Sequence, residues 1–466
     1  MEPFIRINQD TISLRDPKVR IIQRLNEHAK AYFTGVIKDE IKDRYVDMAD
    51  ASTTLEISYQ GEDKKLVHLF RGRLMNIRVR ATANVYYIVG EAVSHTYDMD
   101  MKIKRWPFQN PKLTYSKLVE QVLEPYKGAN WNSSLDKTKS LQNFTMQYDE
   151  TDWEFLKRMA SRFRWGLIPN ATATKPQFYF GPPQGVDKGT LTSFNFSVTR
   201  KMDSGIKDGA NSNLLYYKIY SSGKKSVLLN IGDFVTYKNR SLYVLQSIAV
   251  IHHGVLKHEY VLTTSDGLQQ KPLFNSEMKG TSLKGKVLAV EEDRVKVHFH
   301  EIDTKKPTVA EICSFPHATF YTAEGDTGWY CMPEVDDEVN IYFPSDKEEE
   351  AIVTHSIRKK EEEGDLIKQP EVKIFMTRHR KAIAFTNNEI LITGKDDEVL
   401  IRLIDDHGIE IHSKKDIRIK AEDNLLLQAG NTVQISAQNT LGLKCKTSLL
   451  ELDGDVKIQG EKVKTN

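Results

Sequence analysis

The stretch from Ile401 to Ser448 constrains the fold more than any other part of the chain, because it consists of six consecutive octads. In order, the octads are IRLIDDHG, IEIHSKKD, IRIKAEDN, LLLQAGNT, VQISAQNT and LGLKCKTS. Positions one and three of every octad are aliphatic: Ile401, Leu403, Ile409, Ile411, Ile417, Ile419, Leu425, Leu427, Val433, Ile435, Leu441 and Leu443. Position five is mostly small, and positions seven and eight collect turn-forming residues. Alternation followed by turn chemistry predicts one short strand and one corner per octad.

The eight-residue period is too short for a single chain to enclose a core. A strand advances by roughly 3.3 Å per residue, so one octad supplies one side and one bend. Three chains that each contribute one side of a triangle can enclose the aliphatic positions around a shared axis. The repeat therefore predicts an intertwined trimeric β-helix, or β-prism, in which octads climb about 5 Å each and six make a rod of roughly 30 Å. The alternative is an ordinary antiparallel meander in which the constant spacing is a coincidence.

Composition limits the classes of protein to which the chain can belong. Its 466 residues are enough for about three domains. Lys and Arg number 66 against 64 Asp and Glu, and the net charge of +2 gives no argument for nucleic acid as a partner. The sequence has no run of about 18 apolar residues and no signal-peptide pattern. Cys313, Cys331 and Cys445 have neither metal-site nor disulfide spacing, so we expect synthesis in a reducing cytoplasm without a signal peptide.

Residues 1–275 have the pattern of a mixed α/β domain. Asp16-Pro17 predicts the start of a helix that continues over the apolar residues from Val19 to Ala29. A second helix is expected to begin near Thr114. Alternating apolar residues predict strands at 54–58, 65–70, 74–79, 85–89, 177–180, 227–230, 233–237, 242–251 and 258–263.

The third predicted helix of this region has the clearest signal. Thr151 and Glu154 have the spacing of a capping box, in which each side chain bonds to the backbone N–H of the other residue. Apolar residues at helical spacing then fall on one face of this hub helix: Trp153, Leu156, Ala160 and Phe163. Basic residues cover the other face: Lys157, Arg158, Arg162 and Arg164.

Residues 281–357 have the pattern of a small all-β domain. Strands are expected at 285–290, 295–300, 329–332, 341–343 and 351–356, and five strands in about 75 residues suit an OB-type Greek-key barrel. A charged linker is expected at 358–372, and residues 373–466 are assigned to a needle that contains the octads. The predicted fold class is thus mixed α+β and all-β: an α/β hub with β-barrels, an OB-type barrel and a trimeric β-helix needle.

No set of residues has the spacing of a catalytic or cofactor site. Glycan hydrolysis needs two carboxylates about 5–10 Å apart, and no such pair is framed by aromatic residues. His298 and His300 share one side of a predicted strand and would need a third ligand such as Glu301 to hold a metal, so a polar strand face is the simpler interpretation. Cys445 falls in the small fifth column of the octads and fits a core position. We expect no catalysis, no cofactor, no metal and, because the barrel strands lack an aromatic and basic stripe, no nucleic acid.

The order of hub, OB-type barrel and octad needle resembles the VgrG-like spike and hub proteins of contractile injection systems. These systems include type VI secretion tips, phage-tail-like bacteriocins, extracellular injection particles and contractile phages. The hub helix within residues 147–160 and the triplet Phe70-Arg-Gly72 look like the hub motifs of that family. Its barrel strands and the entry to its needle are similar to residues 285–287, 294–299, 333–339, 382–386 and 390–393.

The resemblance implies a homotrimer that caps an inner tube and contacts baseplate proteins. It also implies a small PAAR-like protein that caps the tip, and effector cargo in some systems. Asp336 stands where the family commonly has Gly, so that barrel turn is expected to differ. Residues 456–466 contain no histidine, so the iron-binding pair at the tip of some relatives is not expected. No lysozyme or effector domain is expected between barrel and needle.

Together these features predict a mechanical function. The trimer would be the central spike of a contractile particle, delivered outside the cell or into a target, and would puncture the target cell envelope. Two alternatives stay open. A trimeric phage-tail receptor-binding fibre should carry an exposed aromatic patch or a globular head, and a cell-wall-degrading spike enzyme should turn over murein.

Overall fold

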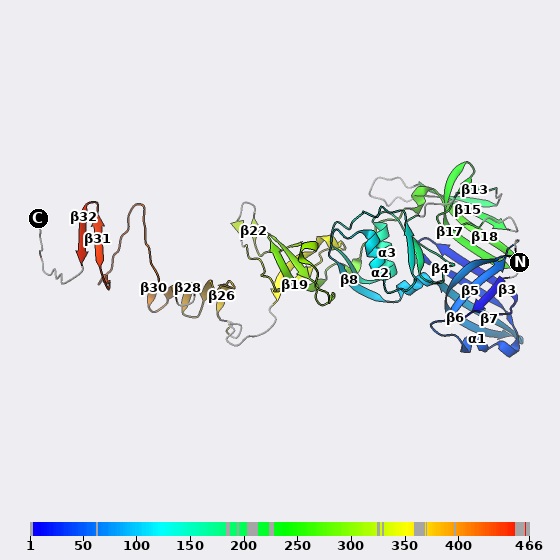
Figure 1. Cartoon of the computed structure of the whole chain (residues 1–466), viewed down its shortest axis with the longest axis horizontal. Helices are drawn as coiled ribbons and strands as arrows, with labels where there is room; N and C mark the ends of the chain where they lie inside the picture. Colours follow the sequence, from blue (N-terminus) through cyan, green and yellow to red (C-terminus); the bar gives the residue numbers. More distant parts are fainter. Residues whose placement is uncertain are drawn as a thin grey trace. The chain divides into compact units, whose positions relative to one another are not determined.

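The computed structural model describes residues 3–61, 64–182, 187–192, 195–202, 213–222, 228–323, 327–328, 330–357, 369, 371–395, 398–452 and 462. The chain forms two compact units, Met1–Lys359 and Lys360–Asn466. The regular secondary structure of both units is mainly β-strand (Figure 1). The described α-helices are α1 (Arg44–Asp47), α2 (Tyr115–Leu123) and α3 (Asp152–Ser161). Short 3-10 helices are η1 (Asp39–Ile41), η2 (His95–Asp100), η3 (Ser265–Leu268), η4 (Ser276–Met278), η5 (Val309–Glu311) and η6 (Glu348–Glu350). None of the described helices is long and apolar enough to cross a membrane.

The largest sheet joins strands from the beginning and the end of the predicted hub. Its thirteen described strands are β1 (Pro3–Ile7), β2 (Asp10–Thr11), β3 (Arg15–Arg24), β4 (Glu27–Ile37), β5 (Thr54–Gln60), β6 (Leu66–Thr82), β7 (Val85–Ser94), β13 (Asp187–Thr190), β14 (Phe196–Met202), β15 (Asn213–Ser222), β16 (Phe234–Tyr237), β17 (Arg240–His252) and β18 (Val255–Thr263). Eleven of them follow the order β14-β15-β18-β17-β3-β4-β7-β6-β5-β1-β2, while β16 pairs with β17 and β13 pairs with β16.

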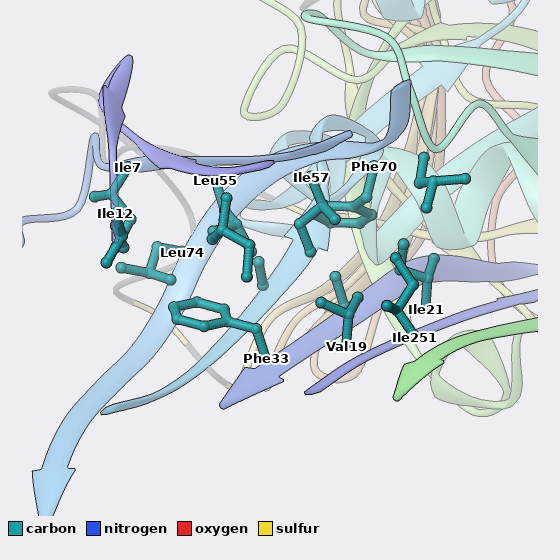
Figure 2. Close-up of a cluster of buried hydrophobic side chains, with 14 of the residues drawn as sticks. Ile7, Ile12, Val19, Ile21, Phe33, Leu55, Ile57, Phe70, Leu74 and Ile251 are labelled. Atoms are coloured by element: carbon teal, nitrogen blue, oxygen red, sulfur yellow. The ribbon is translucent and has the colours of Figure 1, made fainter. Parts of the chain in front are cut away.

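Alternation along these strands buries one apolar face in a common core. On β3, Val19 and Ile21 are buried, whereas Lys18 and Arg20 between and beside them are exposed. Figure 2 shows side chains from separate strands pointing into one cluster, namely Ile7, Ile12, Val19, Ile21, Phe33, Leu55, Ile57, Phe70, Leu74 and Ile251. The period of two therefore specifies which face of the sheet is covered.

The helix predicted after Asp16-Pro17 is wrong, because these residues belong to β3. Val19 and Ile22 have helical spacing, but Val19 and Ile21 are the buried pair, which is strand spacing. Strand β3 pairs with β4 along one edge and with β17 along the other. Its backbone hydrogen bonds are therefore satisfied between strands. The hub is mostly β, rather than the expected α/β domain.

A second core within the hub gathers α2, α3 and two small sheets. The strands of these sheets are β8 (Ile103–Phe108), β9 (Asn130–Ser133), β10 (Thr145–Thr151), β11 (Leu167–Pro169) and β12 (Gln177–Phe180). Strand β10 pairs with β8, and β12 lies between β11 and β9. Thr114 caps α2 by accepting a hydrogen bond from the backbone N–H of Lys117 at 3.3 Å, so the helix predicted near Thr114 is confirmed.

Most of the strands predicted for the hub are present. Those at 54–58, 85–89, 177–180, 233–237, 242–251 and 258–263 correspond to β5, β7, β12, β16, β17 and β18. The two strands predicted at 65–70 and 74–79 are one continuous strand, β6. Residues 228–230 form no strand, and residue 227 lies outside the described residues.

The predicted barrel region contains a five-stranded antiparallel sheet in the order β21-β20-β19-β24-β25. Its strands are β19 (Ser282–Glu291), β20 (Arg294–His298), β21 (Phe315–Pro316), β24 (Glu338–Tyr342) and β25 (Ile352–Ile357), and β22 (Thr322–Ala323) pairs with β23 (Thr327–Gly328). Residues 330–332 form no strand, contrary to expectation, and Trp329 lies outside the described residues. The OB-type topology stays a prediction.

Asp336 has the left-handed backbone conformation that glycine favours, with φ of 79°. Its backbone N–H donates to the carbonyl of Val287 at 3.0 Å. Its carboxylate lies 2.8 Å from Nζ of Lys286 on β19. Asp is among the residues that tolerate this conformation. The turn thus keeps a glycine-like backbone although the side chain is larger.

The second unit contains a sheet in which each strand pairs with its neighbour in sequence. Its strands are β26 (Lys373–Met376), β27 (Ala382–Phe385), β28 (Glu389–Lys395), β29 (Val399–Ile404) and β30 (Gly408–Ser413), and a separate hairpin joins β31 (Leu441–Cys445) and β32 (Ser448–Leu452). The first two octads are thus antiparallel partners, β29 and β30. Residues 414–440 form no strand in the single chain, as Figure 1 shows between β30 and β31.

The boundary between the two units can be compared with the predicted domain boundaries. The boundary after Lys359 falls within the predicted linker 358–372, of which only residues 369, 371 and 372 are described. The predicted hub and barrel lie in the same unit. The predicted boundaries at 275 and 281 stay predictions, as does the intertwined prism.

Candidate functional site: the hub helix and the apolar face of the octads

Helix α3 begins with the capping box that the sequence predicts. The Thr151 hydroxyl accepts from the Glu154 backbone N–H at 3.1 Å, and the Glu154 carboxylate accepts from the Thr151 N–H at 3.0 Å. Two of the N–H groups that a helix start leaves without partners are therefore satisfied. The helix is thereby fixed where strand β10 ends.

The predicted apolar residues of α3 lie in the second hub core. Trp153, Leu156 and Ala160 are buried, with Trp153 only 1% exposed. Phe163 lies beyond the last helical residue and is half-buried against Tyr115, with ring centroids 4.7 Å apart. These residues anchor the helix in the hub. Their role in a spike stays a prediction.

The basic residues of α3 are not all at the surface. Arg158 is 3% exposed, and its guanidinium donates to both carboxylate oxygens of Glu150 at 2.7 Å. It also donates to Glu348 at 2.8 Å, and Arg162 donates to the same Glu348 oxygen at 2.5 Å. Two cations and two anions thus form one network, in which Arg162 alone is partly exposed. We call it the Arg158 network; it comprises Glu150, Arg158, Arg162 and Glu348.

The Arg158 network joins the hub to the barrel region within the first unit. Glu150 ends β10 in the hub, whereas Glu348 belongs to η6 between β24 and β25. Burial lowers the pKa of the Arg158 guanidinium, but the carboxylates of Glu348 and Glu150 raise it by more. The net effect is a raised pKa. Breaking a buried pair leaves one charge without compensation and costs about 3–5 kcal/mol. The network therefore couples two predicted domains.

Apolar contacts reinforce this joint. Phe144, next to β10, stacks on Phe299 at a centroid distance of 5.4 Å and meets Phe315 at 5.0 Å. The side-chain amide of Gln109 donates to the carbonyl of Val297 on β20 at 2.7 Å. The joint is therefore a packed core with a buried ionic centre.

Hydrogen bonds around His28 and Asp100 also hold Thr151, the residue that caps α3. His28 Nε2 lies 3.0 Å from Asp100 Oδ2, and its Nδ1 lies 2.8 Å from the Thr96 hydroxyl. The Thr151 hydroxyl donates to the other oxygen of Asp100. Burial raises the pKa of Asp100, but the hydrogen bonds from His28 and Thr151 lower it by more. The pKa of Asp100 is therefore below its ordinary value. The hydroxyl, imidazole and carboxylate resemble a catalytic set, but Thr96 is buried and has no access to a substrate.

The residues weighed as metal ligands or nucleophiles are separated. His298 Nε2 lies 2.8 Å from the carbonyl of Asp303, while His300, beyond the end of β20, lies 3.7 Å from Glu338. No group of three His, Cys, Asp or Glu side chains in the described part of the chain is placed to hold a metal. Cys445 is exposed on β31 in the single chain.

The twelve aliphatic positions of the octads are largely uncovered. Eleven are exposed, from 37% for Ile401 to 70% for Ile409, and Leu441 is half-buried. Cross-strand pairs align them: Ile401 faces Ile411, and Leu403 faces Ile409. The first two octads therefore present an aligned row of apolar side chains to water, and the aliphatic positions of the later octads are exposed as well.

The same apolar face begins before the octads, in residues 373–395 of the predicted needle. One row runs from β26 to β30 through Phe375, Ile383, Ile392, Ile401 and Ile411, each paired with the next. A second row joins Phe385, Ile390, Leu403 and Ile409. All nine residues are exposed. Alternation in the segment 373–395 is the sequence signal for these strands, whereas their continuity with the octad face follows from the strand pairing.

Comparison with known proteins defines the fold. No protein-family model and no curated protein match the chain. A component of the type VI secretion system of E. coli, described as similar to the T4 bacteriophage tail proteins gp27 and gp5, aligns with a TM-score of 0.52 at 13% identity, over 76% of this chain and 99% of that chain. The half-lidded Francisella PdpA–VgrG complex gives a TM-score of 0.56 at 9% identity, over 88% of this chain and 87% of the matched chain. Its lidless form gives 0.54 at 9% identity, over 88% and 98%.

The chain therefore has the fold of the VgrG-like spike proteins, which confirms the resemblance inferred from the sequence. The identities of 9% and 13% limit this likeness to the fold. Of these neighbours, the E. coli protein is the one described as a secretion-system component and as similar to phage tail proteins.

Proposed function

We propose that the chain is the central spike of a contractile injection machine, in which a homotrimeric hub caps the inner tube and a needle punctures the target envelope. The observation that carries the proposal is the apolar face of β26–β30, exposed on five consecutive strands. Fully burying one Leu, Ile or Val side chain stabilises a fold by about 1.5–3 kcal/mol. Monomeric proteins rarely leave a contiguous apolar face of this kind in water.

A second and a third copy of the chain are the natural cover for this face. The octad period supports a shared threefold core, with the twelve aliphatic residues of each chain along its axis. Residues 414–440 would acquire strand partners only in that assembly. An interlocked β-prism unfolds only when three chains separate, which gives the kinetic stability that a puncturing device needs.

The Arg158 network fits a load-bearing role in the same machine. It lies where the hub meets the barrel region, so force on the needle would pass through this joint. A buried, fully paired ionic centre resists sliding because any displacement leaves charges without partners. The OB-type barrel at residues 281–357 would act as a collar, and the charged segment 358–372 as its link to the needle at 373–466.

The remaining parts of the proposal concern partners and location. Inner-tube and baseplate proteins would contact the hub, a small PAAR-like protein would cap the needle, and effector cargo would travel with the spike. The trimer would be synthesised in the cytoplasm without a signal peptide and delivered in a contractile particle. It would work without catalysis, cofactor or metal, and without nucleic acid.

Single-particle electron microscopy of the purified full chain tests the proposal. We expect class averages with a threefold-symmetric head and a thin rod. Addition of the cognate inner-tube protein should place tube rings on the head. Compact particles without a rod, or rods that bind no tube protein, would argue against a spike.

One observation favours the alternative of a receptor-binding fibre. Phe320, Tyr321 and Tyr330 of the barrel region are strongly exposed, and Phe320 is 89% exposed. Large exposed aromatic side chains are common at binding surfaces. A variant with Phe320→Ala and Tyr330→Ala should keep its fold and, if the fibre interpretation is right, lose adhesion to target cells. Unchanged adhesion would leave the spike as the better interpretation.

A further inference from the structure

A cavity of about 580 Å³ in the hub is lined by residues from two sheets. One wall is the large sheet, where Gln23 on β3 pairs with Ser247 on β17, and Ala249 on β17 pairs with His258 on β18. The volume is within the range of about 300–1,000 Å³ that is usual for small-molecule sites. The register therefore gathers three polar side chains, Gln23, Ser247 and His258, on one sheet face.

These three side chains lack hydrogen-bond partners among the described residues. Ser247 and His258 are each only 3% exposed, and Gln23 is half-buried. The Nδ1 atom of His258 is buried and has no hydrogen-bond partner among the described residues. The imidazole ring of His258 stacks on the ring of Tyr260, with centroids 5.5 Å apart. A buried polar group without a partner costs about 1–3 kcal/mol. His258 is such a group, and Ser247 and Gln23 offer further polar groups beside it on the same wall, which points to a molecule that binds there.

The facing wall offers a complementary surface. Tyr179 on β12 and Asn132 on β9 are direct partners in the three-stranded sheet, and both line the cavity. Tyr179 is 37% exposed, so part of its ring is accessible. Neither side chain forms a hydrogen bond within the described part of the chain. This wall thus combines an aromatic ring with an amide that both donates and accepts.

The unpartnered groups in the cavity are uncharged. Lys188 and Asp233 also line it, but Lys188 Nζ lies 3.7 Å from the Asp233 carboxylate. His68, at the rim, lies 2.8 Å from Glu56. Burial lowers the pKa of His258 to about 4, so its imidazole is neutral at physiological pH. A charged ligand would find no free counter-charge among these residues.

We propose that this cavity binds a small neutral carbohydrate, a mono- or disaccharide, between Gln23, Ser247 and His258 on one wall and Asn132 and Tyr179 on the other. Sugar hydroxyls both donate and accept, which matches amide, hydroxyl and imidazole groups that do the same. The apolar C–H face of a sugar ring fits against an accessible aromatic ring. This inference is independent of the spike proposal, because it concerns a site inside one hub.

Ligand-observed NMR of the purified full chain tests the inference. The probes are glucose, galactose, N-acetylglucosamine and chitobiose, with glycerol as a control for weak polyol binding. We expect saturation transfer from the protein to at least one sugar and none to glycerol. Selectivity for the N-acetylated probes would indicate a cell-wall glycan as the source, and selectivity for the plain hexoses would indicate a free sugar.

Two variants connect any binding to the cavity. Gln23→Ala and Ser247→Ala should each weaken sugar binding at least tenfold, whereas Gln246→Ala, which alters the neighbouring position that bonds to Arg24, should leave it unchanged. Thermal melting identifies a variant that fails to fold. Absence of transfer to all four sugars, or equal binding by Gln23→Ala, Ser247→Ala and the native chain, would overturn the proposal.

Discussion

The hub and the octad sheet use the same kind of strand but cover it differently. In the hub, Val19 and Phe33 alternate with polar residues and are buried. In the second unit, Ile409 and Ile411 alternate in the same way and are exposed. The difference lies in the connections: β3 pairs with β17, more than two hundred residues later, whereas β26–β30 pair only with sequence neighbours. Alternation specifies a strand, but packing of other parts of the chain onto its apolar face decides whether that face is covered.

The largest effect is expected from charges on the octad face. The double variant Ile409→Asp with Ile411→Asp places six carboxylates in the proposed shared core, where unpaired charges are strongly disfavoured. We expect the fragment 371–466 to fall from a trimer to single chains, measured by analytical ultracentrifugation. Glu410→Gln, on the opposite face of the same strand beside Arg402, is the control and should stay trimeric. A double variant that remains trimeric would place the interface elsewhere.

The next largest effect is expected at the joint of the first unit. Glu348→Ala leaves Arg158 without one of its two carboxylate partners and should lower the free energy of unfolding by about 3–5 kcal/mol. Chemical denaturation of the full chain measures the loss. Glu349→Ala removes the same charge from an exposed neighbour and should change stability by less than about 0.5 kcal/mol. Equal effects of the two variants would mean that the Arg158 network contributes nothing specific.

Substitutions of two leucines distinguish the folding of one chain from the association of several chains. Leu156→Ala removes buried atoms from the hub and should cost about 2–5 kcal/mol at any protein concentration. Leu403→Ala should destabilise only through the trimer, so its effect on the melting temperature should depend on concentration. Melting curves over a hundredfold concentration range distinguish them. A concentration-independent effect of Leu403→Ala would contradict a shared core.

A smaller effect is expected at the start of the hub helix. Thr151→Ala removes the hydroxyl that caps α3 and should cost about 1 kcal/mol. Thr151→Ser keeps the hydroxyl and should restore most of the loss. Denaturant titration of both variants measures the difference, and equal stability would show that the cap is dispensable.

The smallest effect is a pH dependence at Asp100. Its pKa is lowered in the folded state by the bonds from His28 and Thr151, which prevail over burial. The stabilisation is therefore present above the unfolded pKa of about 3.9 and is lost as pH falls through the lower folded value. The difference in stability between the native chain and Asp100→Asn should be largest near neutral pH and shrink under acid. A gap that stays constant down to about pH 2.5 would contradict this assignment.

Local signals predicted the elements whose partners are close in sequence. The capping box at Thr151 and Glu154 and the cap at Thr114 follow from rules over three or four residues, and both are present. Four strands of the barrel region, β19, β20, β24 and β25, were likewise visible as alternating runs. The structure gives the first two octads the antiparallel pairing of the simple meander, and the threefold prism remains the proposal.

Features that depend on distant parts of the chain could not be predicted. Arg158 looked like one of several basic residues, because its burial depends on Glu348, which lies 190 residues later. The strand at Val19 was mistaken for a helix, because only pairing with β17 shows that Ile21 and not Ile22 is buried. The cavity between β17 and β12 could not be predicted either, because its lining residues come from strands that are distant in sequence. Each of these required knowledge of which strands meet.

The most direct test of a core shared between chains is the absolute mass in solution, by light scattering, of the full chain and of residues 371–466. We predict a trimer for both, at roughly three times the mass of one chain, that persists in mild denaturant. A trimer of the full chain with a monomeric fragment would assign assembly to the hub. A well-folded monomer of the full chain would contradict the shared core and the spike with it.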